Sequence, residues 1–295
     1  RDTCWRTQYD LSLQLHEIAV LSHFSNRTGD QTQLMKRINT VFEHARNFSD
    51  KFNTHRIWTR LLSLSNFPRA IEESLRALEQ LGDPLNLSYI DNIRVRKELE
   101  KQKERFSGDS ETMLAQSLED QNKKNAMKIM TSLMLYYASR KSCLGAFISC
   151  RMIEITVKYG YCEDSIVGVA GFAASLVSSL GDIDGGSTWG RKAMALMKLC
   201  GKKSLIPAVG FALYGTVFVW KDPIQSTLDS LAEGIRSSFA YGNVEFAVVN
   251  TYLYISRSYQ SGKNIRVLTE EVEALARQHG IRVDDSDEEH FGNTP

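Results

Sequence analysis

The chain has 295 residues, of which 42% are hydrophobic, so it is long and apolar enough to bury a substantial core. Its 36 Lys and Arg residues nearly balance its 35 Asp and Glu residues, which gives a net charge of +1. This composition excludes a wholly disordered chain, and the charge excludes a global attraction to nucleic acid or anionic lipid. Partners must therefore be recognised by local surfaces.

The first predicted region, residues 1–82, consists of N-terminal helical repeats. Turn signals occur at Gly29, Asn47–Asp50, Asn66 and Gly82, and the apolar residues between them follow a helical period. No comparable run alternates with the period of a strand. The clearest helical series is Leu34, Ile38, Val41, Ala45 and Phe48.

The second predicted region, residues 83–125, is a charged and polar connector. Its segment Arg94–Arg105 is almost wholly charged, and Lys97, Lys101 and Arg105 form a basic stripe at helical spacing. Such a stripe suits an acidic partner or phosphates, but we favour a solvated helix face with internal ion pairs.

The third predicted region, residues 126–276, contains C-terminal helical repeats, and residues 277–295 form an acidic tail. Turn signals recur at intervals of about 20 residues, so two helices make a unit of about 40 residues. Two helical apolar series lie between these signals: Ile224, Leu228, Leu231, Ile235 and Phe239, and then Val244, Val248, Ile255 and Tyr259. The turn signals are Gly160, Gly181, Gly201, Asp222–Pro223, Gly242 and Gly262.

Helix ends support an all-α chain. Asp222–Pro223 and Asn66–Phe67–Pro68 each place a capping side chain before a proline that suits the first helical turn. Short turns between helices predict an α-solenoid of antiparallel helix pairs. Two stretches without charge, Ser165–Gly181 and Ser204–Trp220, are short for a membrane span and contain Gly and Ser. We therefore expect buried helices and no membrane span.

The stretch Ser179–Leu196, SLGDIDGGSTWGRKAMAL, is the best candidate for ligand chemistry. It lacks the Ser or Thr and the preceding strand of a P-loop, and it lacks the ligands at the fifth and twelfth positions of a calcium-binding EF-hand. We therefore predict a turn: Gly181 ends one helix, Asp182–Ser187 crosses over, and Ala193, Leu196 and Met197 resume a buried face. We expect Gly190 to permit a close helix approach.

Other catalytic patterns are incomplete, so we predict no catalytic, cofactor-binding or metal-binding residues and no cofactor. The adjacent carboxylates of Glu72–Glu73 and Glu163–Asp164 should point to different sides of their helices. The tyrosines of Tyr136–Tyr137 and the group Tyr252, Tyr254 and Tyr259 should serve interhelical packing. The histidines lack metal-binding spacing: His16, His23, His44, His55, His279 and His290.

Five cysteines lie along the chain without CxxC spacing, which argues against a disulfide framework and a zinc site. We expect reduced, mostly buried thiols in a cytosolic protein. The N-terminus shows neither a signal sequence nor a starting Met, which predicts a segment of a longer protein. The cysteines are Cys4, Cys143, Cys150, Cys162 and Cys200.

Seven motifs, in this order, resemble one family: the tetratricopeptide-like helical region that follows the AAA-type, STAND-class NTPase module of large signalling proteins. Those proteins often also carry serine/threonine kinase, GAF, histidine kinase or cyclase domains. The unit of about 40 residues departs from the usual 34 of a tetratricopeptide repeat. The motifs are YDLSLQLHEIAV at Tyr9–Val20, NRTGD at Asn26–Asp30, SDKFN at Ser49–Asn53, AIEESLRALEQLGDPL at Ala70–Leu85, VKYGYCEDSIVGVAGFA at Val157–Ala173, GRKAMAL at Gly190–Leu196 and YGNVEFA at Tyr241–Ala247.

The resemblance implies a cytoplasmic, non-catalytic sensor or scaffold that binds protein partners or flanking domains of its own chain, with nucleotide chemistry in those flanking domains. Nucleic acid and membrane are not expected as partners. Two alternatives remain open: a self-contained all-α enzyme with a pocket between helices, and an RNA-binding helical repeat, whose binding would depend steeply on salt.

Overall fold

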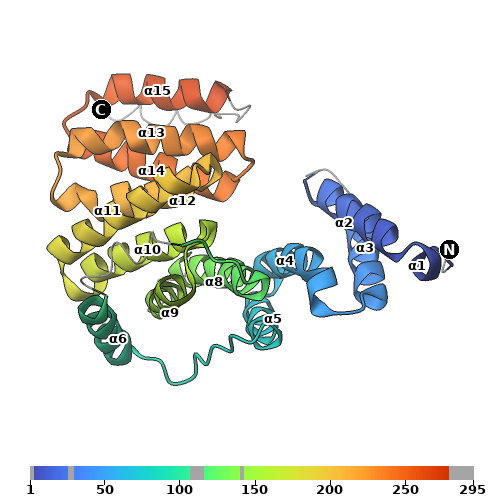
Figure 1. Cartoon of the computed structure of the whole chain (residues 1–295). Coiled ribbons are helices and arrows are strands. Elements are labelled where there is room, and N and C mark those ends of the chain that lie inside the picture. The colour runs from blue at the N-terminus through green and yellow to red at the C-terminus, as the bar shows by residue number, and fades with distance from the viewer. Residues whose placement is uncertain (1–2, 26–29, 107–115, 140–142, 279–295) are drawn as a thin grey trace. The chain divides into compact units, whose positions relative to one another are not determined.

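The protein is all-helical in the computed structural model, which describes residues 3–25, 30–106, 116–139 and 143–278 (Figure 1). Within these ranges no strand is present, and the β-type contact is an isolated bridge between Ser117 and Tyr161. The prediction of an all-α chain is confirmed. The chain divides into two compact units, one made from residues 1–91 and 118–148 and the other from residues 92–117 and 149–295.

The first unit contains helices from both sides of the segment 92–117. Its helices α2, α3 and α4 enclose a small core of Val20, Leu34 and Ile38, against which Phe42 and Trp58 pack. Helix α8 packs against α4 and α5. The helices are α1 (Thr3–Thr7), α2 (Tyr9–Ser25), α3 (Gln31–His44), α4 (Phe48–Ser65), α5 (Phe67–Gln80) and α8 (Gln121–Ser139).

The second unit stacks its helices largely in sequence order. Helix α10 packs against α11 and α12, α12 packs against α13 and α14, α13 packs against α14, and α14 packs against α15 (Figure 1). The helices are α6 (Asn92–Arg105), α9 (Leu144–Tyr159, whose first residues belong to the first unit), α10 (Glu163–Ser175), the π-helix η1 (Leu176–Leu180), α11 (Ile183–Cys200), the 3-10 helix η2 (Lys203–Leu205), α12 (Ile206–Thr216), the 3-10 helix η3 (Phe218–Trp220), α13 (Ile224–Ala240), α14 (Val244–Gln260) and α15 (Ile265–Gln278).

The predicted segment 83–125 is shared between the two units. Its helix α6 belongs to the second unit, where Lys103 forms an ion pair with Asp182 at 2.7 Å. Asp83 and Lys123 belong to the first unit and pair with each other at 2.5 Å. The division into 1–82, 83–125, 126–276 and 277–295 stays a prediction, and most of the acidic tail lies outside the described residues.

The predicted glycine turns within the described residues are confirmed, and Gly29 lies outside those residues. Gly82, Gly160, Gly181, Gly201, Gly242 and Gly262 all have positive φ, between 62° and 106°, which only glycine adopts without steric cost. The turn at Asn66 is confirmed as well, because the Asn66 side chain accepts a hydrogen bond from the backbone N–H of Arg69 at 3.2 Å. Backbone sterics within a few residues therefore set the ends of most helices.

The predicted cap at Asp222 is wrong. Pro223 itself occupies the cap position of α13, in an extended conformation with φ of −54° and ψ of 136°, and no side chain caps this helix. A proline disfavours helical geometry in the residue before it, here Asp222. Pro223 also lies outside the helix, so Asp222 is one position too early to be the cap. The carboxylate of Asp222 instead lies 3.9 Å from Arg191.

The helical period of the α14 series is confirmed, but its members differ in burial: Ile255 packs against the core, whereas others are exposed. Val248, Tyr252 and Tyr259 are 63% to 71% exposed, whereas Asn250 is fully buried and donates a hydrogen bond to the carbonyl of Pro207 at 3.0 Å. Helices approach closely on this side, because a Cβ at Gly234 would lie 3.0 Å from Asn250 Oδ1. Phe246 and Tyr254 are each 8% exposed, so α14 also buries large side chains.

Two described helical stretches, Glu163–Leu180 and Lys203–Trp220, are long and apolar enough to cross a membrane by length and composition alone. Of these stretches 56% and 39% of the residues are buried inside the protein. Core helices of other proteins meet the same criteria, so this observation is a weak indication of a membrane span.

Candidate functional site

The stretch Ser179–Leu196 forms a turn between two helices, as predicted. Helix α11 begins at Ile183, and the carboxylate of Asp182 caps it by accepting a hydrogen bond from the Gly185 backbone N–H at 2.9 Å. The predicted crossover over Asp182–Ser187 is wrong, because this cap starts the helix directly after Asp182. The turn therefore comprises only Gly181 and Asp182, and the residues from Ile183 to Ser187 belong to α11.

Two glycines of α11 serve close packing. A Cβ at Gly186 would lie 2.4 Å from Val177 Cγ2, and one at Gly190 would lie 3.0 Å from the ring of Phe218. The predicted role of Gly190 is confirmed. Since side chains of neighbouring helices fill the space above these glycines, the stretch is a packing element and offers no cradle for a ligand.

Titratable groups show few clusters. Within the described parts of the chain, no three His, Cys, Asp or Glu side chains gather in a way that suits a metal ion, and His279 and His290 lie outside those parts. Glu72 and Glu73, expected on different sides of their helix, both contact Arg76, at 2.6 and 3.1 Å. One long guanidinium side chain reaches residues three and four positions back, so this shared contact does not place the two carboxylates on the same side of the helix.

The cysteines are thiols without disulfide bonds. Cys150 is buried, Cys4 is exposed and the other three are partly buried, so the expectation of mostly buried thiols is wrong. Burial raises the pKa of Cys150, Cys162 and Cys200, which keeps these sulfurs protonated and poorly nucleophilic at neutral pH.

The tyrosines divide between packing and exposure. The ring of Tyr136 lies 6.0 Å from that of Phe67, and Tyr254 is 8% exposed, which confirms the packing role for these two. Tyr252 and Tyr259 are largely exposed on α14, so the prediction is wrong for them.

The basic stripe of α6 forms ion pairs both within its own helix and with a neighbouring helix. Lys101 pairs with Glu98 of the same helix at 3.2 Å, as expected for a solvated face. Arg105, in contrast, reaches Glu154 of α9 at 3.5 Å. The stripe residue Lys97 is exposed. The stripe therefore also fastens α6 to its neighbour.

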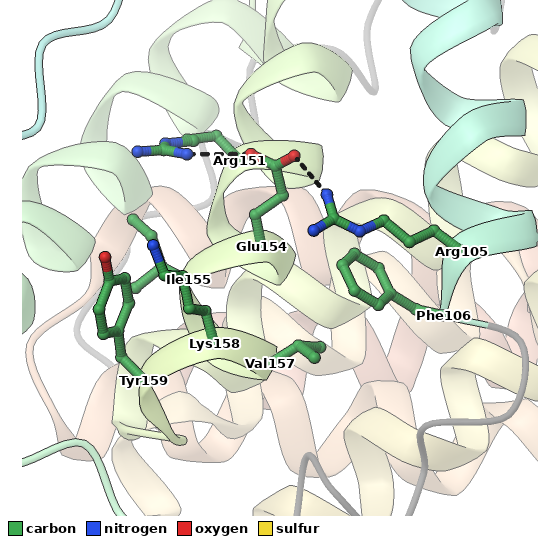
Figure 2. A pocket seen from close by; sticks show the side chains of 8 residues that line it. All are labelled: Arg105, Phe106, Arg151, Glu154, Ile155, Val157, Lys158 and Tyr159. Atoms are coloured by element: carbon green, nitrogen blue, oxygen red, sulfur yellow. Dashed lines mark hydrogen bonds and ion pairs between the residues drawn. The ribbon is translucent and has the colours of Figure 1, made fainter.

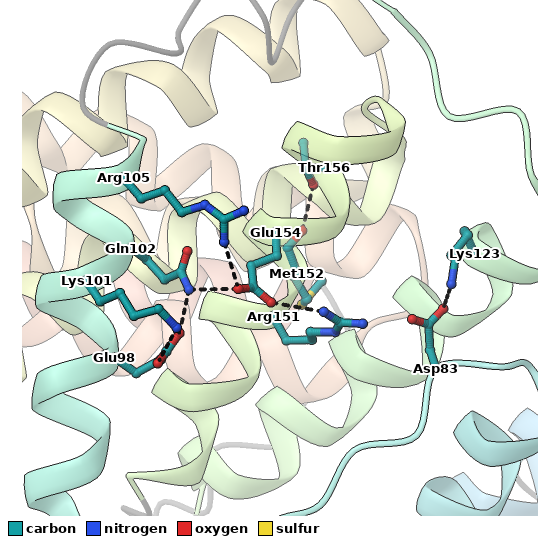
Figure 3. Close-up of polar contacts among 10 residues, drawn as sticks. All are labelled: Asp83, Glu98, Lys101, Gln102, Arg105, Lys123, Arg151, Met152, Glu154 and Thr156. Carbon is teal, nitrogen blue, oxygen red and sulfur yellow. Dashed lines mark hydrogen bonds and ion pairs between the residues drawn. The ribbon is translucent and has the colours of Figure 1, made fainter.

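Glu154 is the centre of a polar network between α6 and α9 (Figure 3). Its carboxylate accepts hydrogen bonds from Gln102 at 2.9 Å and from Arg151 at 3.0 Å, besides the contact to Arg105. Gln102 is fully buried and also donates to Glu98. One carboxylate thus orients two guanidinium groups at the edge of a pocket, which Figure 2 shows.

A different surface appears on α2 in the first unit. Leu11, Leu15, Ile18 and Leu21 are between 52% and 63% exposed. Their spacing of four, three and three residues places them in one stripe along the helix. The opposite face of α2 supplies Val20 to the core. We call these four residues the α2 stripe.

A groove of about 420 Å³ runs beside the α2 stripe, between α2 and α4. Its size is that of sites that hold a small molecule or a few side chains. Ile18 and Leu21 belong both to the stripe and to the groove, so the two form a continuous apolar surface. The groove is lined by Glu17, Ile18, Leu21, Phe24, Asn53, Thr54, Arg56, Ile57 and Arg60.

Charged and polar groups surround this apolar surface. Arg56 and Arg60 are exposed on the α4 side, and the guanidinium of Arg60 lies 5.4 Å from the centre of the Phe24 ring. Burial raises the pKa of Glu17, whose Oε1 accepts no hydrogen bond from the described residues. The buried hydroxyl of Thr54 likewise has no described hydrogen-bond partner. The groove thus combines an apolar floor, two cations and two unsatisfied polar atoms.

Sequence reasoning missed both surfaces. The α2 stripe had a signal in the sequence, because α2 carries Leu, Ile and Val on every side and a helix of that kind must bury more than one face. The pocket between α6 and α9 had a weaker signal. Arg105 belonged to the predicted stripe, but nothing in the local pattern connected it with Arg151 and Glu154.

Comparison of the chain with models of protein families, with curated proteins and with solved structures finds no match.

Proposed function

We propose that the chain is a non-catalytic scaffold or sensor: an α-solenoid of antiparallel helix pairs that binds a protein partner and passes this event to NTPase and kinase or cyclase domains of a larger signalling protein. The α2 stripe with its groove carries the proposal, because contiguous exposed apolar surface of this kind marks interaction sites. The packing of the consecutive pairs α10 with α11, α12 with α13 and α13 with α14 supports the solenoid, and the order of the seven motifs supports the signalling context.

The occupant of the α2 stripe is an amphipathic helix of a partner protein with acidic residues beside its apolar face. A helix fits because the stripe repeats at helical spacing, so the ridges of one helix enter the grooves of the other. Acidic flanks fit because Arg56 and Arg60 stand on the α4 side of the groove.

Fluorescence polarisation of a labelled amphipathic peptide tests this surface. The peptide is a helix with a leucine stripe and glutamate flanks, and its matched control carries lysine flanks. We expect the full chain to bind the glutamate peptide at least about tenfold more tightly, the effect of one or two charge contacts at a partly desolvated rim.

Variants locate the binding. Leu15→Asp and Ile18→Asp should abolish binding, because each places a charge on the apolar floor. Leu64→Asp is the matched control, since Leu64 is 76% exposed on α4 but lies outside the groove. Equal affinity for both peptides would refute the acidic partner. A dimer in sedimentation experiments that Leu15→Asp dissociates would instead identify a second copy as the occupant.

Two measurements address the remaining parts of the proposal. The purified chain should not turn over ATP or GTP, and turnover by the chain alone would refute a non-catalytic role. A Walker A motif in the coding sequence upstream is expected for the NTPase context, and a start codon directly before Arg1 would contradict it.

A further inference from the structure

The pocket between α6 and α9 lies in the second unit and is independent of the α2 stripe. Its volume is about 350 Å³, within the range of small-molecule sites. Helix α6 contributes Arg105 and Phe106 at its C-terminal end, and successive turns of α9 contribute the rest, as Figure 2 shows. The residues from α9 are Arg151, Glu154, Ile155, Val157, Lys158 and Tyr159.

The pocket has an apolar floor. Phe106 is 4% exposed and Ile155 is 1% exposed, so both are already fixed by the core. Val157 and the ring of Tyr159 are partly exposed beside them. Such a floor favours an aliphatic or aromatic body of a ligand.

The rim of the pocket is cationic. The lining residues include three cations, Arg105, Arg151 and Lys158, and one carboxylate, Glu154, which gives an excess of two positive charges among them. Glu154 contacts the terminal nitrogen Nη1 of each guanidinium, at 3.5 Å for Arg105 and 3.0 Å for Arg151. A guanidinium carries five N–H donors in a planar fork, which matches the oxygen atoms of a phosphate.

Lys158 is the cation best placed to respond to a ligand. It is exposed, its Nζ lies 4.9 Å from the centre of the Tyr159 ring, and none of the described carboxylates forms an ion pair with it. The other charges near the rim are already matched, because Lys101 pairs with Glu98 and Lys103 with Asp182.

We propose that this pocket binds a small organic phosphate, with the phosphate at Arg105, Arg151 and Lys158 and its apolar body on Phe106 and Ile155. A phosphate monoester carries nearly two negative charges at neutral pH, which equals the excess charge of the rim. The volume of the pocket, about 350 Å³, limits the ligand to a small molecule. The carboxylate of Glu154 holds the two guanidinium groups in place without neutralising the pocket.

Isothermal titration calorimetry of the full chain with phenyl phosphate tests the proposal. Inorganic phosphate and benzyl alcohol are the matched probes, each with one half of the recognised chemistry. We expect phenyl phosphate to bind at least about tenfold more tightly than either probe. Equal affinity for inorganic phosphate would overturn the organic ligand, and no binding of phenyl phosphate would overturn the site.

Substitution of the rim locates the binding. Lys158→Gln should weaken phenyl phosphate about tenfold, the effect of losing one charge-assisted contact, and Lys158→Arg should restore most of the affinity. Arg236→Gln, at an exposed ion pair of α13, is the control and should leave the affinity unchanged. Circular dichroism melting curves confirm that the variants fold. Unchanged affinity in Lys158→Gln would place the ligand elsewhere and overturn the proposal.

Discussion

His55 makes the stability of the first unit depend on pH. It lies on α4, is 6% exposed, and is surrounded by the rings of Phe42, Phe48 and Trp58 at centroid distances of 5.3 to 6.3 Å. Burial, with a smaller contribution from the charge of Lys51, lowers the pKa of His55 from 6.5 to about 4. The imidazole therefore stays neutral in the folded protein under conditions where it is protonated in the unfolded chain.

The size of the effect follows from these two pKa values. As the pH falls from 6.5 towards 4, the unfolded chain binds a proton at His55 that the folded protein does not, so the free energy of unfolding decreases. The decrease amounts to about 2 kcal/mol at pH 5 and approaches about 3 kcal/mol below the folded pKa. The pH dependence from this histidine fades above the unfolded pKa and is negligible above about pH 7.5.

Urea unfolding followed by circular dichroism at pH 7 and pH 5 measures this effect. The variant His55→Leu removes the titrating group and a buried ring nitrogen that has no described hydrogen-bond partner. Between pH 7 and pH 5, the free energy of unfolding should decrease by about 2 kcal/mol more in the wild type than in this variant. His23→Leu, at a partly exposed position of α2, is the control. An equal loss in wild type and His55→Leu would refute the reasoning.

Three further substitutions test the fold, each by urea unfolding. Asp182→Ala removes the cap of α11 and the ion pair with Lys103, and it should lower the free energy of unfolding by about 1–2 kcal/mol. Asp222 caps nothing, so Asp222→Ala should change this free energy by less than about 0.5 kcal/mol, and an equal cost of the two variants would contradict the assigned caps. Asp83→Asn leaves Lys123 beside a neutral, buried side chain and should cost about 3 kcal/mol, and a cost near zero would show that the pair is solvated. Gly186→Ala brings a Cβ to 2.4 Å from a neighbouring methyl carbon, so a cost of about 1–3 kcal/mol is expected and a stabilised variant would rule out the close approach.

Predictions that depended on local backbone geometry were the most successful. Gly82 and Gly160 have the left-handed conformation that their place after apolar stretches indicated, and Asn66 caps its helix. The exception is Asp222, because a proline permits two positions at a helix start, and packing around it decided between them.

Predictions about surfaces were less successful. Tyr252 and Tyr259 were expected to pack between helices, but both are exposed on α14, whereas Tyr254 and Asn250 of the same helix are buried. The exposure of the α2 stripe was not predicted. Its leucines look like core residues, and only the packing of α2 shows that one face has no neighbour among the described residues of its unit.

The sequence by itself determined that the described chain is helical and where most helices end, because hydrophobic period and turn sterics act over a few residues. Tertiary structure alone decided which face of each helix is buried and which charges meet. Gln102 and Arg105 lie about fifty positions from Glu154 in sequence, yet their contacts build the rim of the pocket. Such contacts depend on how whole helices approach each other, and local sequence patterns do not encode that distance.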